Sequence, residues 1–112
     1  MYAESKETGL KGLCYHEAFK FLPKVRNEYG SCILIHGSIL LKDGKRVGHG
    51  WIELLGEGIV WDSLNGFLPK LDFYNALSPE VIETYTPEEA AKLWIKHGHT
   101  GPWNSDYVII LK

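Results

Sequence analysis

Three side chains of the sequence have the chemistry and the chain order of a nucleophilic triad. Cys14 supplies a thiol, His49 an imidazole and Asp62 a carboxylate, with gaps of 35 and 13 residues between them. A carboxylate can orient an imidazole, which then takes the proton of a thiol and later delivers it to a leaving group. This combination predicts acyl transfer through a thioester, provided that the fold brings the three residues together.

The segment 48–63 is predicted to hold the imidazole and the carboxylate on one β-hairpin. Alternation along its first strand places His49, Trp51 and Glu53 on one face. Gly56 and Glu57 can form a two-residue type II′ turn. In that register Trp51 faces Asp62, and Asp62 lies diagonally across from His49, about 7–8 Å away between backbones, which the two side chains can span.

The thiol is predicted to sit at the start of a helix. A helix that begins near Leu13 or Cys14 would surround the sulfur with unpaired N–H groups and the positive end of the helix dipole, and both favour a thiolate. Gly9 and Gly12 just upstream would let the backbone approach a substrate closely. Residues 1–8 are polar and mixed in charge, which favours a flexible tail.

The other elements follow from periodicity and turn residues. The first helix is expected to reach Leu22, where Pro23 ends or kinks it, with a further helical turn closed by Gly30. The run 31–41 is apolar on both faces and is predicted to be a central strand. Asp43-Gly44 indicates a type I′ turn into a second strand, and a third strand completes a meander. These two strands are expected over 46–55 and 58–63.

The C-terminal half contains the clearest helix signal. Thr86-Pro87-Glu88-Glu89 has the pattern of a capping box with Pro at the first helical position, and Gly98 is expected to stop this helix. Strands are predicted over 81–85 and 106–112, while Pro69 argues against a central strand in 67–76. The resulting class is α+β with a helix packed on a mostly antiparallel sheet.

Composition and charge limit the possible functions. The 112 residues suit a single domain over 1–112, and the net charge is −2 with scattered basic residues, so no nucleic-acid partner is expected. The apolar runs are too short to cross a membrane, and the N-terminal residues have no signal-peptide core, so we expect a cytoplasmic protein. The two cysteines are therefore expected to be free thiols.

Three short blocks resemble a known family. The blocks are Gly12-Leu13-Cys14-Tyr15, then 48–53, then Val60-Trp61-Asp62. Their order is similar to the core of the transglutaminase-like branch of papain-like cysteine enzymes. That family has a Gly-x-Cys at a helix start, a His-Ala-Trp-x-Glu-like strand and a later strand with Asp, in this order. The resemblance covers residues 9–65 and implies a papain-like fold.

The resemblance also implies roles. It makes Cys14 the nucleophile, His49 the general base and acid, and Asp62 the orienter of the ring. The substrate would be a protein or peptide with an amide or isopeptide bond, contacted near Trp51, Gly12 and Tyr15. No metal or organic cofactor is implied, and the oligomeric state is left open. The backbone N–H of Cys14 would stabilise the oxyanion, together with the lead-in or Tyr2.

Other interpretations stay open beside the enzyme. The chain could be a binding module with a papain-like scaffold and no turnover, or a redox protein if Cys14 and Cys32 pair. Cys32 and His36 are expected in the core, because both fall in the apolar strand. His16 is expected to face solvent or a partner. His97 and His99 flank Gly98, but no third metal ligand has fitting spacing.

Overall fold

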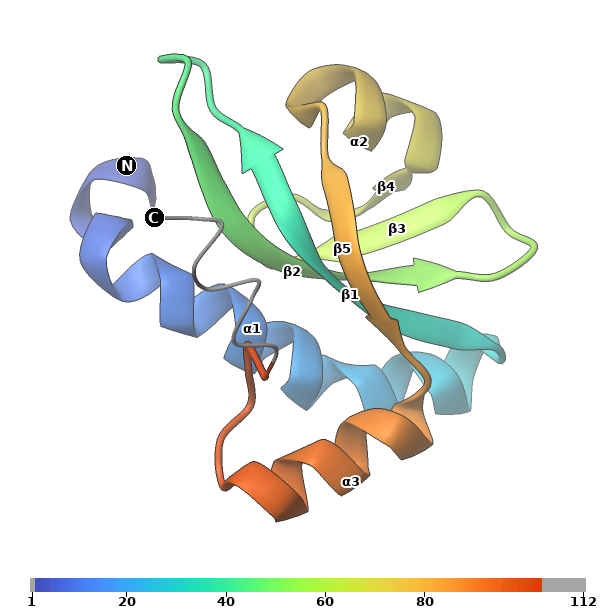
Figure 1. Ribbon diagram of the computed structural model, residues 1–112. Coiled ribbons are helices and arrows are strands. Elements are labelled where there is room, and N and C mark those ends of the chain that lie inside the picture. Colours follow the sequence, from blue (N-terminus) through green and yellow to red (C-terminus); the bar gives the residue numbers. More distant parts are fainter. Residues whose placement is uncertain (1, 104–112) are drawn as a thin grey trace.

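The structure, a computed structural model, describes residues 2–103, with side chains from residue 14 onward (Figure 1). Three helices and five strands lie in this part of the chain. In order they are α1 (Tyr2–Tyr29), β1 (Cys32–Leu40), β2 (Arg46–Leu54), β3 (Ile59–Asp62), β4 (Gly66–Pro69), α2 (Lys70–Leu77), β5 (Glu80–Tyr85) and α3 (Pro87–His97).

The five strands form one antiparallel sheet in the order β4-β3-β2-β1-β5. β1 is paired on both sides, as its two-sided apolar sequence predicts. β2 and β3 pair with Ile52 opposite Trp61, which is the predicted register of the hairpin. The α+β class with an antiparallel sheet is therefore confirmed.

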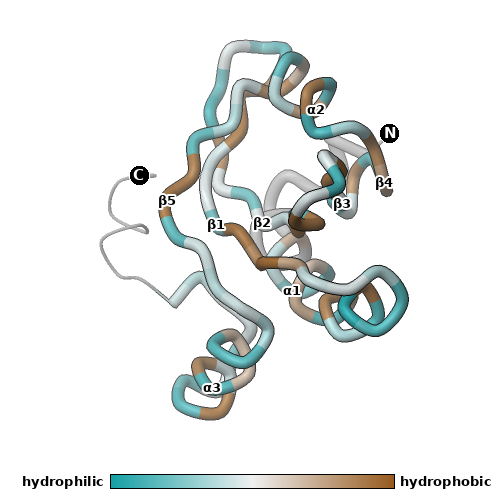
Figure 2. The backbone as a smooth tube through the Cα atoms, turned by 90° about the vertical axis from the view of Figure 1, so that its right-hand side faces the viewer, coloured by the Kyte–Doolittle hydropathy of each residue, from teal (hydrophilic) through white to brown (hydrophobic). Residues whose placement is uncertain are grey.

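Helices cover the two faces of the sheet unequally (Figures 1 and 2). α1 and α3 lie on one face, where Leu22 and Ala90 join Ile52 in a buried cluster. α2 lies on the other face, where its Phe73 packs with Trp51 in a second buried cluster. Neighbouring residues of β2 thus point to opposite cores, as strand alternation requires.

The helix signal at Thr86 is confirmed in detail. The Thr86 side-chain oxygen accepts from the Glu89 N–H, and the Glu89 carboxylate accepts from the Thr86 N–H. Pro87 is the first residue of α3, and the helix ends at Gly98, which has a left-handed φ of 77°. Two backbone groups at the start of α3 are therefore satisfied by side chains of its own first turn.

The predicted start of the first helix is wrong. α1 begins at Tyr2, so residues 2–8 are helical rather than a flexible tail, and Cys14 lies in the interior of the helix. Gly9 and Gly12 are inside it as well. A glycine lowers helix stability by only about 1 kcal/mol relative to alanine, which other interactions can outweigh. Pro23 also lies within α1, which continues to Tyr29.

The two predicted two-residue turns are longer than expected. The first hairpin closes with a Leu41–Lys45 backbone bond and uses Gly44 at a φ of 89°. The second uses residues 55–58, and the Leu54 carbonyl accepts from the Glu57 N–H. The extra residues leave the register of β2 and β3 unchanged. The remaining predicted strand, 106–112, lies outside the described residues.

Candidate active site

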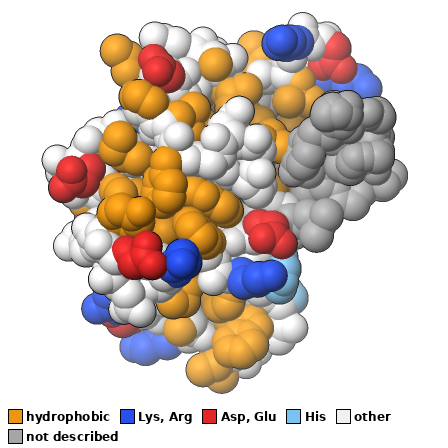
Figure 3. Space-filling model, turned by 180° about the vertical axis from the view of Figure 1, so that it is seen from behind, with side chains coloured by type: hydrophobic (Ala, Val, Ile, Leu, Met, Phe, Trp, Pro, Cys, Tyr) orange, Lys and Arg blue, Asp and Glu red, His pale blue; other side chains and the backbone are white. Residues whose placement is uncertain are grey.

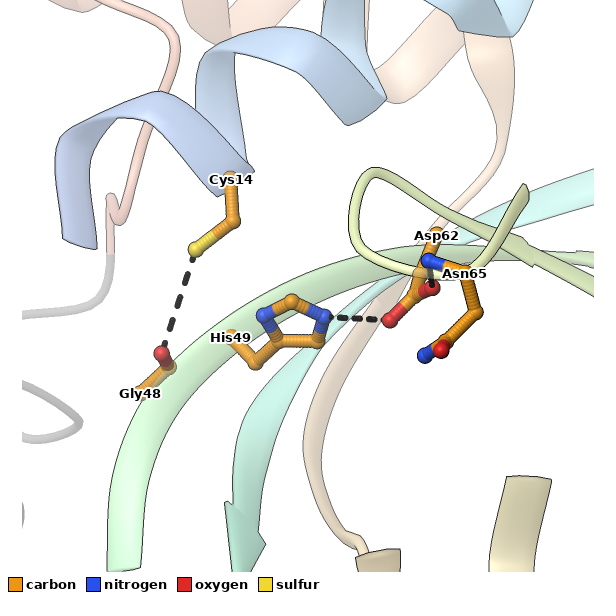
Figure 4. A network of polar contacts seen from close by, with 5 residues as sticks. All are labelled: Cys14, Gly48, His49, Asp62 and Asn65. Atoms are coloured by element: carbon orange, nitrogen blue, oxygen red, sulfur yellow. Dashed lines mark hydrogen bonds and ion pairs between the residues drawn. The ribbon is translucent and has the colours of Figure 1, made fainter. Parts of the chain in front are cut away.

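The candidate site lies where β2 extends beyond β3. β3 pairs with β2 only at residues 52–54, so His49 lies on a part of β2 that has no β3 residue beside it. α1 runs along this part of the strand, and the Cys14 sulfur lies 3.9 Å from the carbonyl oxygen of Gly48 (Figure 4). The difference in strand length thus creates the place where a helix side chain reaches His49.

His49 and Asp62 are joined as the hairpin register predicts. The His49 Nε2 and Asp62 Oδ2 atoms are 2.8 Å apart, and both side chains are buried. The other carboxylate oxygen, Oδ1, accepts the Asn65 N–H at 2.8 Å. Asp62 therefore contacts the ring and also caps the turn that follows β3. Its two bonds fix the plane of the group and so the direction of the imidazole.

The imidazole also contacts the thiol. The Cys14 side chain is a hydrogen-bond partner of His49. Figure 4 shows that the ring nitrogen away from Asp62 lies on the side of Cys14. Because Nε2 is engaged by Asp62, Nδ1 is the nitrogen available to the sulfur. The three predicted residues, from α1, β2 and β3, are therefore gathered in one cluster.

The electrostatics of the cluster favour a charged ring. Burial by itself lowers the pKa of His49, but the hydrogen bonds and charges of Asp62 and Cys14 outweigh burial and raise this pKa from 6.5 to about 9. The contacts with Asp62 and Cys14 thus favour the protonated form of the ring. A positively charged partner of this kind is what a cysteine thiolate requires.

The predicted activation by a helix terminus is wrong. Cys14 is inside α1, so it is remote from the unpaired N–H groups of the first turn. In a continuous helix the N–H of residue 14 is bonded to the carbonyl of residue 10, which removes it as the predicted oxyanion donor. The Tyr2 side chain lies outside the described side chains. Among the described side chains, His49 is the one whose contact with Cys14 could supply activation of the sulfur.

Two of the three residues predicted to contact substrate, Trp51 and Tyr15, are buried and pack around the site. Trp51 is 0% exposed and its ring stacks on His49 with centroids 6.0 Å apart. Tyr15 is 3% exposed and meets the edge of His36 at 4.8 Å. Gly12 is part of α1, where its backbone is helical. Trp51 and Tyr15 thus hold the imidazole and the helix in place in this conformation.

The other candidate residues fall into the core or onto the surface. Cys32 is buried and free, and burial raises the pKa of its thiol. His36 is buried among the rings of Tyr85 and Trp103, and burial lowers its pKa to about 3. His16 is exposed, 3.5 Å from the Thr100 hydroxyl. Within residues 2–103, no three His, Cys, Asp or Glu side chains could hold a metal.

The cluster is closed to solvent. Cys14 and His49 are each 1% exposed and Asp62 is 0% exposed. A cavity of about 480 Å³ lies elsewhere, between α1 and α3, and its lining includes Phe19, Pro23 and Pro87. A substrate can therefore reach the sulfur only after part of the structure moves.

Gly50 sets how closely α1 approaches β2. A methyl group there would lie 3.1 Å from Tyr15 Cδ1 and 3.3 Å from Tyr15 Cα. The second atom belongs to the backbone, so the helix that carries Cys14 would have to shift. We expect Gly50→Ala to lower the free energy of unfolding by about 1–3 kcal/mol, measured by urea titration. An unchanged midpoint would show that the helix has room to move.

No known protein family, curated protein or solved structure matches the chain. None of the helices within residues 2–103 is long and apolar enough to span a lipid bilayer.

Proposed function

We propose that the protein is a cysteine-dependent hydrolase or acyl transferase that acts on peptide or carboxamide bonds. The observation that supports this most is the position of His49, which hydrogen-bonds Asp62 through one nitrogen and is also a partner of Cys14. The order of these residues agrees with the resemblance to transglutaminase-like enzymes, whose papain-like core is likewise part of the proposal.

The proposed reaction uses only these three side chains. The Cys14 thiolate attacks the carbonyl carbon, and a carbon–sulfur bond forms. The carbon–nitrogen bond then breaks as the His49 imidazolium gives its proton to the leaving amine. Water or a second amine attacks the thioester, the ring takes the proton of this nucleophile, and the thiolate leaves. Asp62 holds the ring throughout and balances its charge.

Thiol alkylation tests whether Cys14 is activated. The rate of iodoacetamide labelling should be measured against pH in Cys32→Ala, where Cys14 is the remaining thiol. We expect the labelling rate to rise at a pH well below about 8.5, the pKa of an ordinary thiol, because His49 stabilises the thiolate. Closure lowers the rate at every pH, so the midpoint of the profile is the informative quantity.

Matched variants give this test its controls. In Cys32→Ala/His49→Asn the midpoint should move up to the ordinary thiol range, while Cys14→Ser should leave only slow labelling of the buried Cys32. An ordinary midpoint in Cys32→Ala itself would contradict the proposal. Release of ammonia or amine from peptide carboxamides should fall by about 10³-fold or more in Cys14→Ala.

A second candidate function is a binding module without turnover. The exposure of Cys14, only 1%, favours it, because a buried cysteine commonly acts as a small apolar side chain. In that case the Cys14–His49–Asp62 cluster would only join α1 to the sheet. The labelling profile separates the two candidates, since a joining role needs no thiolate.

A further inference from the structure

One face of the β3–β4 hairpin is apolar throughout. Ile59 pairs with Pro69 and Trp61 pairs with Phe67, so the four side chains share a face. Two rings of α1 extend it: Phe21 stacks on Trp61 at 4.3 Å, and Tyr29 meets Phe67 at 5.2 Å. We call this surface the aromatic face, formed by Phe21, Tyr29, Ile59, Trp61, Phe67 and Pro69.

The aromatic face is only partly covered: Phe21, Ile59 and Trp61 are half-buried, and its remaining large rings are exposed. Tyr29 is 50% exposed and Phe67 is 42% exposed. Figure 3 shows a broad hydrophobic area on the side of the molecule opposite to that of Figure 1. α1 packs mainly on β1 and β2 and meets only the margin of β3. Large exposed apolar areas on a folded chain mark interaction sites.

The sequence of the two strands also indicates a covering partner. Their opposite face carries Val60 and Leu68, which pack in the cluster that contains Phe73 of α2. Apart from Asp62, the hairpin therefore carries apolar residues on both faces, a pattern that is typical of strands covered on both sides. Among residues 2–103, the aromatic face is covered only at its margin, by α1.

We propose that the aromatic face is the interface between two copies of this chain, related by a twofold axis. The charges beside it fit such a contact. Lys24 and Glu28 form an ion pair of 3.2 Å on α1, three and seven residues after Phe21, so they border the face. Figure 3 shows acidic and basic side chains side by side at the lower border of the hydrophobic area.

This pair is self-complementary. A twofold axis places each patch against the same patch of the partner, so the lysine of one copy can face the glutamate of the other. The net charge of −2 adds little repulsion between copies. The proposal does not depend on the enzymatic function.

The outer edge of β4 favours a face-to-face contact over strand addition. β4 has four residues and ends at Pro69, which has no N–H to donate. Short edges that contain proline are typical of sheets that avoid pairing with another strand. Association is therefore expected to bury rings rather than to continue the sheet.

Sedimentation of the full chain at micromolar concentration tests the proposal. The wild type should sediment as a dimer, and Phe67→Glu should be monomeric, because a carboxylate would be buried between the copies. Ile95→Glu is the matched control: Ile95 is 76% exposed on α3, away from the aromatic face, and this variant should remain a dimer. A monomeric wild type would overturn the proposal.

Charge reversals test the geometry without disturbing the rings. Lys24→Glu and Glu28→Lys should each weaken self-association by about tenfold, because like charges then face each other. An equimolar mixture of the two variants should form a heterodimer, and the double reversal should restore the homodimer. The twofold arrangement would be overturned if Phe67→Glu abolishes the dimer but neither the equimolar mixture nor the double reversal restores association.

Discussion

Asp62→Ala is expected to lower the free energy of unfolding by about 3–5 kcal/mol, because it leaves a buried imidazolium without its counter-charge. The carboxylate is 0% exposed and accepts from both His49 and the Asn65 N–H. Removing it therefore leaves the buried ring of His49 and the part-buried N–H of Asn65 without their acceptor. The loss should be measured by urea unfolding at pH 7, followed by circular dichroism.

Two further variants make this result specific. Asp62→Asn keeps the size of the side chain and should recover part of the loss, because the amide oxygen can accept one of the two bonds. Asp72→Ala, at an exposed position in the first turn of α2, should cost less than about 1 kcal/mol. A loss for Asp62→Ala as small as that for Asp72→Ala would contradict a buried charged pair.

Stability is expected to fall as the pH rises from 6.5 to 9. The pKa of His49 is raised from 6.5 to about 9 in the folded protein, so the folded state holds its proton more tightly than the unfolded chain. This contribution is complete below the unfolded pKa and is lost as the pH passes through the folded pKa. At about 1.4 kcal/mol per pKa unit, the loss is about 3 kcal/mol.

Urea unfolding in steps from pH 6 to pH 10 would measure this slope. The slope should be smaller in Cys14→Ser, where Asp62 remains the main group that raises the pKa, and nearly absent in His49→Asn. The order of the three slopes identifies the titrating group. A wild-type curve that is flat between pH 6.5 and 9 would show that the ring is neutral in the folded state.

Local sequence signals predicted the parts of the site that lie on the hairpin. Alternation in β2 and the register with β3 place His49 within reach of Asp62, because strand pairing is set by neighbouring residues along a short connection. The capping box at Thr86 was equally readable, since both partners lie within one helical turn. The enzymatic role of the cluster stays a prediction.

Tertiary packing decided what the sequence did not reveal. α2 has eight residues, so its apolar positions Phe73, Tyr74 and Leu77 are too few to establish a helical period in the sequence. The extension of α1 back to Tyr2 overrides two glycines that locally favour an end. The closure of the site likewise depends on how α1 and the sheet meet, which no local pattern records.

The placement of Cys14 on α1 rather than on the hairpin also orders the assembly of the cluster. His49 and Asp62 are 13 residues apart on adjoining strands, whereas Cys14 is separated from Gly48 by 34 residues. Short connections close before long ones, so the imidazole and carboxylate should meet before the helix docks. In refolding experiments, a brief pulse of thiol reagent would then find an ordinary cysteine first. The moment at which the reactivity of Cys14 changes would show when the helix docks on the sheet.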